Sequence, residues 1–177
     1  MSWMDPETRI RCYAGPNRGV FTYGAFCSGG FTWRINPQGW NSSHDYLPRD
    51  QGSKPLVVLI GDSYIEAFWT DLSDHIETRI TELSGNTVNC YAFGTWGAML
   101  SQYLALSEYV AEEYQPDVIV LFLNDQDLSG SLGEENASRL FCHTLVLKSS
   151  GEIERVSPPM LTVNPLIPVI LQSATLR

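Results

Sequence analysis

The sequence predicts an α/β fold: a three-layer α/β/α sandwich with a mainly parallel sheet. Three short, largely apolar runs, 56–60, 87–92 and 117–123, have the length and composition of buried strands. The segments between them, 73–84 and 99–114, have the pattern of helices. Strands that alternate with helices favour parallel pairing through right-handed crossovers.

Residues 1–54 differ from the rest of the chain. They are rich in Gly, Pro and aromatic residues and contain several turn signals, so we expect an N-terminal extension of loops and short strands packed on the domain 55–177. Trp33, Trp40 and Tyr46 are the aromatic candidates for lining a substrate cleft. We favour a packing role for all three.

The first strand, 56–60, runs directly into Gly61-Asp62-Ser63. Ligands of parallel α/β sheets bind at the carboxyl ends of the strands, where Ser63 falls. A serine at the end of a strand is in a position suited to a catalytic nucleophile. On local grounds the tripeptide fits a Gly-Asp turn with Ser63 as helix N-cap equally well.

The remaining elements follow in order. The helix 73–84 opens at Ser73, and the strand 87–92 is followed by two glycines three residues apart, Gly94 and Gly97, where backbone can approach a ligand closely. The helix 99–114 ends before Pro116, and the strand 117–123 ends at an Asn-Asp pair. A hairpin over 140–156 turns at Ser150-Gly151. Helical spacing predicts five core residues in the second helix: Met99, Leu100, Tyr103, Leu104 and Leu106.

We therefore expect three groups to lie at the edge of the sheet where the strands end: Ser63, the amide of Gly97 and the side chain of Asn124. We call this edge the rim. Acyl transfer requires a nucleophile and preorganised donors for the oxyanion, and these residues meet that requirement. We expect Asp62 to bond backbone amides of its own turn. Asp125 and Asp127 are interpreted as solvated turn residues rather than metal ligands. No metal and no cofactor is expected.

Four cysteines lack the CxxC spacing of a zinc site. Cys90 and Cys142 lie in apolar runs and are expected to be small buried hydrophobes. A Cys12–Cys27 bridge is an alternative if the protein is exported.

These motifs resemble the SGNH (GDSL-type) hydrolase superfamily, whose blocks begin with Gly-Asp-Ser, then a Gly, then an Asn. Ser63, Gly97 and Asn124 match three of the four blocks. The resemblance extends to a bacterial subgroup through Asp5-Pro6-Glu7 and the Arg-Ile-Asn of 34–36, although Asn41 stands where that subgroup often has Arg. It implies a flavodoxin-like sheet, with Ser63 as nucleophile and Gly97 and Asn124 in the oxyanion hole.

The fourth block, an Asp-x-x-His that supplies the acid and base, does not occur after Asn124. His44, His75 and His143 are the only histidines. His75 is expected in the first turn of a helix on the far side of the Ser63 strand, and His143 as a half-exposed strand histidine. The acid-base pair is therefore unassigned, and we expect either a domain incomplete at its C-terminus or a variant that has lost the pair.

The net charge of −9, from 20 acidic and 11 basic residues, argues against nucleic-acid binding and adhesion to anionic membranes. Four prolines interrupt the apolar stretch 158–171, so we expect no membrane insertion. That stretch is expected to pack on the domain or on a partner chain, which would give a homo-oligomer. With no secretory signal in the sequence as given, the expected location is cytoplasmic, or the cell envelope or periplasm if a signal was removed.

The resemblance implies an esterase, or an O-acyl transferase or deacetylase, that acts on an acylated carbohydrate or a small ester. Its base would come from a segment absent here, from a partner or from His143. One alternative is a non-catalytic module of the same type that binds a carbohydrate or a protein. Another is a fragment that assembles with a second chain through its Pro-rich tail.

Overall fold

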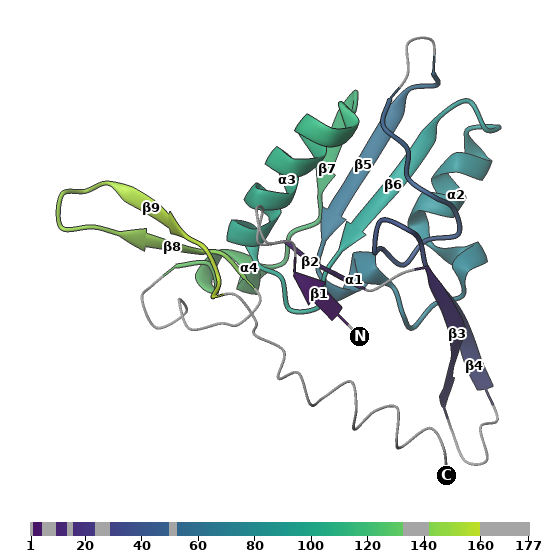
Figure 1. Ribbon diagram of the computed structural model, residues 1–177, viewed down its shortest axis with the longest axis horizontal. Helices are drawn as coiled ribbons and strands as arrows, with labels where there is room; N and C mark the ends of the chain where they lie inside the picture. Colours follow the sequence, from purple (N-terminus) through teal and green to yellow (C-terminus); the bar gives the residue numbers. More distant parts are fainter. Residues whose placement is uncertain are drawn as a thin grey trace.

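A computed structural model describes residues 2–4, 10–13, 16–23, 29–49, 53–132 and 142–159 of the protein. The fold is mixed α/β around a parallel three-stranded sheet of order β6-β5-β7 (Figure 1). Its strands are β5 (Leu56–Gly61), β6 (Asn89–Gly94) and β7 (Val118–Leu121). In the register, Gly61 lies opposite Gly94, and Ile60 lies opposite Leu121. The parallel pairing that the sequence predicts is confirmed.

Two apolar clusters lie on opposite faces of this sheet. Helix α3 (Leu100–Tyr114) contributes Tyr103 and Leu106 to the larger cluster, where they join the β5 side chains Val58 and Ile60. Side chains alternate between the faces of a strand. Leu59 of β5 accordingly belongs to the second cluster, against which α2 (Ile76–Leu83) packs.

The predictions of the two helices differ in accuracy. α3 matches its prediction to within one residue at its start, although Leu104 is 45% exposed, so its assignment to the core is wrong. The helix predicted from Ser73 is interrupted: a 3-10 helix η2 (Leu72–Asp74) precedes α2, and His75 in extended backbone separates them.

The sequence predicts that residues 117–123 form a buried strand. The strand forms, but the prediction that it is buried is wrong. Val118, Val120 and Leu123 are 49%, 37% and 58% exposed. Within the described part of the chain, β7 is an edge strand with a single neighbour, and only Ile119 packs against the larger cluster. An all-apolar run indicates burial on both faces only when neighbouring elements cover both faces.

The N-terminal extension forms two antiparallel hairpins, β1 (Ser2–Met4) with β2 (Arg11–Tyr13) and β3 (Asn17–Tyr23) with β4 (Gly29–Ile35). The loop after β4 covers the outer edge of β6. Nε2 of His44 lies 3.0 Å from the carbonyl oxygen of Cys90, and the Tyr46 hydroxyl accepts from the Ala92 amide at 3.0 Å. This contact protects a sheet edge that would otherwise be unpaired.

The aromatic side chains of the extension pack as expected. Trp40 and Tyr46 are 2% and 1% exposed, and both rings contact Phe93. Trp33 is half-buried and meets Phe68 edge-on. The predicted packing role is confirmed for Trp40 and Tyr46.

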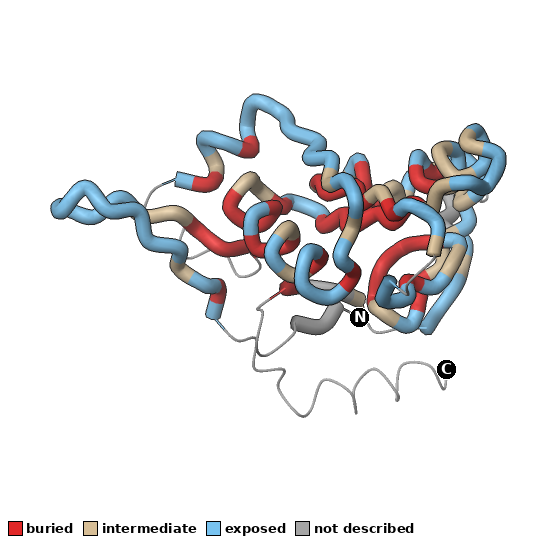
Figure 2. Tube along the Cα trace, turned by 90° about the horizontal axis from the view of Figure 1, so that it is seen from above, coloured by how far each residue is buried: buried red, intermediate tan, exposed pale blue. Residues whose placement is uncertain are grey.

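The predicted hairpin is confirmed as β8 (Thr144–Leu147) and β9 (Ile153–Val156). Gly151 has a φ of 84° in its turn, which explains the glycine. Figure 2 shows the tip of this hairpin as an exposed projection, and Arg155 ties its base to Glu108 of α3. The Pro-rich stretch from residue 160 onward, the Cys12 side chain and Cys27 lie outside the described residues.

Candidate active site at the carboxyl ends of the strands

Ser63 is the first residue of the short helix α1 (Ser63–Glu66), directly after β5. The N-cap is Asp62, whose Oδ1 accepts from the Tyr64 amide at 2.9 Å. The alternative that Ser63 caps the helix is therefore wrong, whereas the turn-stabilising role of Asp62 is confirmed. Because the cap is supplied by its neighbour, the half-exposed Ser63 hydroxyl is not used to close the turn.

The two glycines after β6 have different roles. A Cβ on Gly94 would lie 1.9 Å from the backbone nitrogen of Glu66, so this glycine lets α1 cross the end of β6. A Cβ on Gly97 would meet nothing within 4 Å, but its φ is 71°. Gly97 is the third residue of a turn in which the Ala98 amide donates to the Thr95 carbonyl at 3.0 Å. Its amide has no acceptor within the described part of the chain.

Asn124 follows β7 and caps α4 (Asp125–Ser129). Its side-chain Oδ1 accepts from the backbone amide of Gln126, and its backbone amide donates to Oδ2 of Asp127. The two bonds form a capping box. The Asn124 Nδ2 donates to Oδ2 of Asp62 at 3.1 Å. A side-chain amide carries two hydrogens, so one remains for a further acceptor.

The ends of all three strands therefore lie side by side. Asp62 links β5 to β7 through Asn124, and the Thr95 amide donates to the Gly61 carbonyl at 3.2 Å, which joins β5 to the turn of Gly97. Figure 1 shows β5 and β6 pointing toward α1. The rim is formed by residues that the sequence predicted from strand ends.

The two aspartates after Asn124 lie in different surroundings. Asp125 is exposed, as interpreted, but Asp127 is 2% exposed and also accepts from the Tyr103 hydroxyl at 3.2 Å. The interpretation of Asp127 as a solvated turn residue is therefore wrong. Its carboxylate fixes the start of α4, and with it Asn124. Desolvation raises the pKa of the Tyr103 phenol well above its usual range.

In the described part of the chain, none of the three histidines hydrogen-bonds Ser63. His75 is buried, and its Nε2 bonds the carbonyl oxygen of Thr70. Desolvation lowers the pKa of both His44 and His75, so neutral imidazoles are favoured there. His143 is 4% exposed and precedes β8, so its assignment as a half-exposed strand residue is wrong.

The segment of His143 nevertheless contacts the rim. The Cys142 thiol lies 3.4 Å from the Gly97 carbonyl oxygen, and the His143 amide donates to Oε1 of Gln102. The expectation that Cys142 and Cys90 are buried is confirmed, and desolvation raises the pKa of Cys90 to about 12. An inert thiol is expected from such a pKa.

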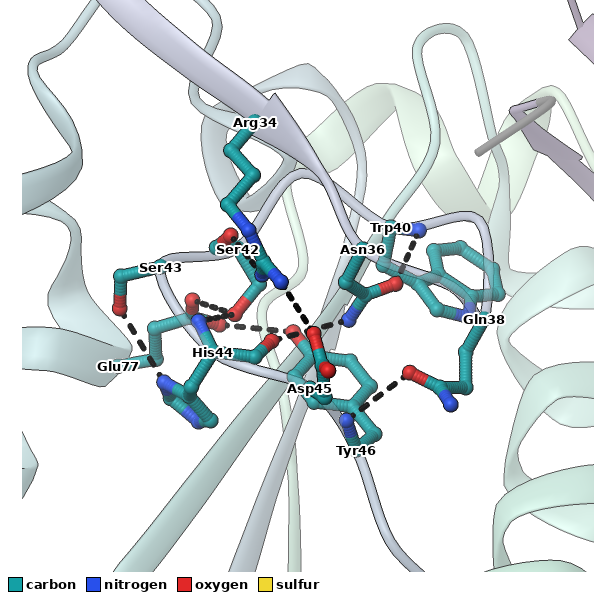
Figure 3. Close-up of polar contacts among 10 residues, drawn as sticks. All are labelled: Arg34, Asn36, Gln38, Trp40, Ser42, Ser43, His44, Asp45, Tyr46 and Glu77. Atoms are coloured by element: carbon teal, nitrogen blue, oxygen red, sulfur yellow. Dashed lines mark hydrogen bonds and ion pairs between the residues drawn. The ribbon is translucent and has the colours of Figure 1, made fainter. Parts of the chain in front are cut away.

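A second polar cluster, which the sequence analysis missed, lies where the loop after β4 meets β6 and α2 (Figure 3). Glu77 of α2 is fully buried, with its Oε1 accepting from Ser42 Oγ at 2.6 Å and its Oε2 lying 3.0 Å from the Tyr46 hydroxyl. Desolvation raises the pKa of Glu77 to about 7. This cluster joins the N-terminal extension to α2.

Two aromatic side chains at the rim were also missed. Tyr64 follows Ser63 and Trp96 precedes Gly97, and they are 83% and 67% exposed. The signal in the sequence that could have identified them is their position next to Ser63 and Gly97.

Among the described residues, no cluster of three or more metal-binding side chains is found, and no helix there has the length and apolarity needed to cross a membrane. The chain matches no protein-family model and no curated protein sequence.

Proposed function

We propose that the protein is an SGNH-type serine esterase or O-acyl transferase, with Ser63 as nucleophile, that acts on an acylated carbohydrate or a small ester. The observation that carries the proposal is the hydrogen bond between Asp62, the residue before Ser63, and Asn124. It joins two residues of the motif blocks that are 62 positions apart in the chain. The three-layer arrangement belongs to the same proposal, and apolar clusters on both faces of the sheet support it.

The chemistry follows from the donors at the rim. Ser63 Oγ attacks the acyl carbon while a base takes its proton, and the oxyanion accepts from the amides of Ser63 and Gly97 and from the second Nδ2 hydrogen of Asn124. Collapse of this intermediate expels the alcohol, which receives the proton from the base. Water, or an acceptor hydroxyl in a transferase, then cleaves the acyl-serine and restores the hydroxyl.

The proposal requires an imidazole within hydrogen-bond reach of Ser63 Oγ. Of the three histidines, His143 is the one whose neighbour, Cys142, contacts the Gly97 turn. The other sources are a segment outside the described residues and a partner chain. Mutation of His143 separates the first source from the other two.

Covalent labelling with a fluorophosphonate, followed by intact-mass measurement between pH 6 and 9, tests the proposal. We expect a single adduct that disappears in Ser63→Ala and persists in Ser73→Ala, the matched change at an exposed serine outside the rim. Loss of the adduct in a folded His143→Ala protein would assign the base to His143. A folded wild-type protein that forms no adduct contradicts the enzymatic proposal.

The second candidate is a non-catalytic binding module that uses the same rim for a carbohydrate or a protein. The observation in its favour is that Nε2 of His44 and of His75 bonds backbone carbonyl groups and not Ser63. Failure to label, together with retained ligand binding, would select this function.

A further inference from the structure

The rim carries two large aromatic side chains that the fold does not use for packing. Tyr64 and Trp96 are 83% and 67% exposed, whereas Tyr46 and Trp40 are 1% and 2% exposed in the core. Large aromatic side chains are usually mostly buried, so two exposed at one edge of a sheet indicate a contact surface.

Both side chains arise at the ends of adjacent strands. Gly61 of β5 lies opposite Gly94 of β6, and the Thr95 amide bonds the Gly61 carbonyl. Tyr64 follows Gly61 by three positions, and Trp96 follows Gly94 by two. The close approach of Glu66 to Gly94 places α1, which carries Tyr64, directly over the end of β6.

The charged groups next in sequence to this rim's motif residues are carboxylates. Asp62 is partly exposed, and Asp125, which follows Asn124, is exposed. In a chain with a net charge of −9, these groups repel an anionic ligand, and covering them with an alkyl chain would require their desolvation. They accept hydrogen bonds from hydroxyl groups without a change in charge.

A neutral sugar ring satisfies both parts of this surface, because it has an apolar C–H face that packs on an aromatic ring and hydroxyl groups around its edge. We propose that Tyr64 and Trp96 form a stacking surface for a neutral saccharide, with Asp62 and Asp125 accepting from its hydroxyls. The inference deepens the proposed function by naming the carbohydrate, rather than a simple ester, as the substrate class, and it rests on that function only for the acyl chemistry.

Binding is measured separately from turnover. Cellohexaose, xylohexaose, mannohexaose and chitohexaose are titrated into ¹⁵N-labelled wild-type protein, and the Trp96 indole signal is assigned by its loss in Trp96→Phe. We expect at least one of these neutral oligosaccharides to shift the Trp96 signal. Hexagalacturonate is the anionic comparison and is expected to bind more weakly.

Substitutions identify the surface. Trp96→Ala and Tyr64→Ala are each expected to weaken binding at least about fivefold, with Trp96→Phe retaining most of it because a ring remains. Leu83→Ala is the matched control: Leu83 is 81% exposed and is the last residue of α2. Its binding should equal that of the wild type. Isotherms of the two aromatic-to-alanine variants that match the wild type overturn the inference, as does preferential binding of hexagalacturonate or an absence of binding to all four neutral probes.

These experiments distinguish a failure of the stacking surface from a failure of the proposed enzymatic function. Saccharide binding without Ser63 labelling supports the stacking surface and contradicts the enzyme. Ser63 labelling without saccharide binding keeps the enzyme and overturns the stacking surface. If both are present, the alanine variants should lose activity on an acetylated xylo-oligosaccharide by a larger factor than on p-nitrophenyl acetate.

Discussion

The Tyr46 hydroxyl lies 3.0 Å from Oε2 of Glu77 and 2.9 Å from the carbonyl oxygen of Ala92, and it also accepts from the Ala92 amide. A phenol has one proton and cannot donate to both oxygens. Every partner is satisfied when Glu77 carries a proton and donates it to the Tyr46 oxygen, while Tyr46 donates to Ala92. The geometry accommodates the neutral carboxyl, and burial favours it: desolvation raises the pKa of Glu77 against the opposing effect of the Ser42 and Tyr46 hydroxyls.

This geometry predicts a pH-dependent contribution to stability. The pKa of Glu77 rises from an ordinary 4.5 to about 7 on folding, so the native state holds a proton that the unfolded state releases. The contribution is complete below the unfolded pKa, declines as the pH rises and is lost above the folded pKa. It amounts to roughly 3 kcal/mol.

The measurement compares urea unfolding of the wild type and Glu77→Gln from pH 5 to 8. Glutamine mimics the protonated side chain, so the difference in unfolding free energy should change with pH in favour of the variant. The comparison is necessary because the lowered pKa values of His44 and His75 produce the opposite slope in the wild type. Glu82→Gln, at an exposed position of the same helix, should leave the pH dependence unchanged. A pH-independent difference for Glu77→Gln would contradict the prediction.

The link between Asp62 and Asn124 predicts that Asp62→Asn has a selective effect. Asparagine retains an oxygen for the Tyr64 amide but places an amide group opposite the Asn124 Nδ2 donor. The helix cap should survive, and the link to β7 should be lost. We expect a small loss of stability, about 1 kcal/mol, and a slower reaction of Ser63 with the fluorophosphonate.

The control is Asp125→Asn, which removes the same charge from an exposed residue next to Asn124. If both variants slow labelling equally, the effect is one of net charge and the role of the link is wrong. Side-chain amide signals of Asn124 provide an independent check, because they should shift in Asp62→Asn and remain in place in the control.

The parts of the fold predicted from sequence depend on local information. Apolar runs identify β5 and β6, and helical spacing identifies α3, because a side chain's place along an element follows from its period. The strand ends likewise bring Asp62 next to Asn124. Burial is not local: β7 is as apolar as β5 but lacks a second neighbour among the described residues.

The polar core was not predictable for the same reason. Glu77 is buried because Ser42 and Tyr46, more than thirty residues earlier, supply its partners. A glutamate at the start of a helix ordinarily indicates a solvated residue near the N-terminal dipole. Asp127 is a comparable case, because its burial requires the Tyr103 hydroxyl of another helix.

The difference between the central strand and the edge strand predicts unequal costs for one substitution. Val58→Thr places a hydroxyl at a fully buried site of β5 and should lower the unfolding free energy by about 1–3 kcal/mol. Val120→Thr, at a 37% exposed site of β7, should cost less than about 0.5 kcal/mol. Urea unfolding of the two variants measures both values. An equal cost would mean that another part of the protein covers β7 in solution.

Gly97 provides the last prediction, which separates backbone strain from chemistry. Its φ of 71° lies in the left-handed region and the space around it is open, so Gly97→Ala should cost about 1–2 kcal/mol through the backbone alone. Gly151→Ala is matched to it, because Gly151 has a φ of 84°, equally open space and a position in the β8–β9 turn. Thermal unfolding should show similar losses for both. If the Gly97 amide donates to the oxyanion, as proposed, fluorophosphonate labelling of Ser63 should slow only in Gly97→Ala, where that amide is shifted. Equal labelling rates in the two variants would contradict the proposed role of Gly97.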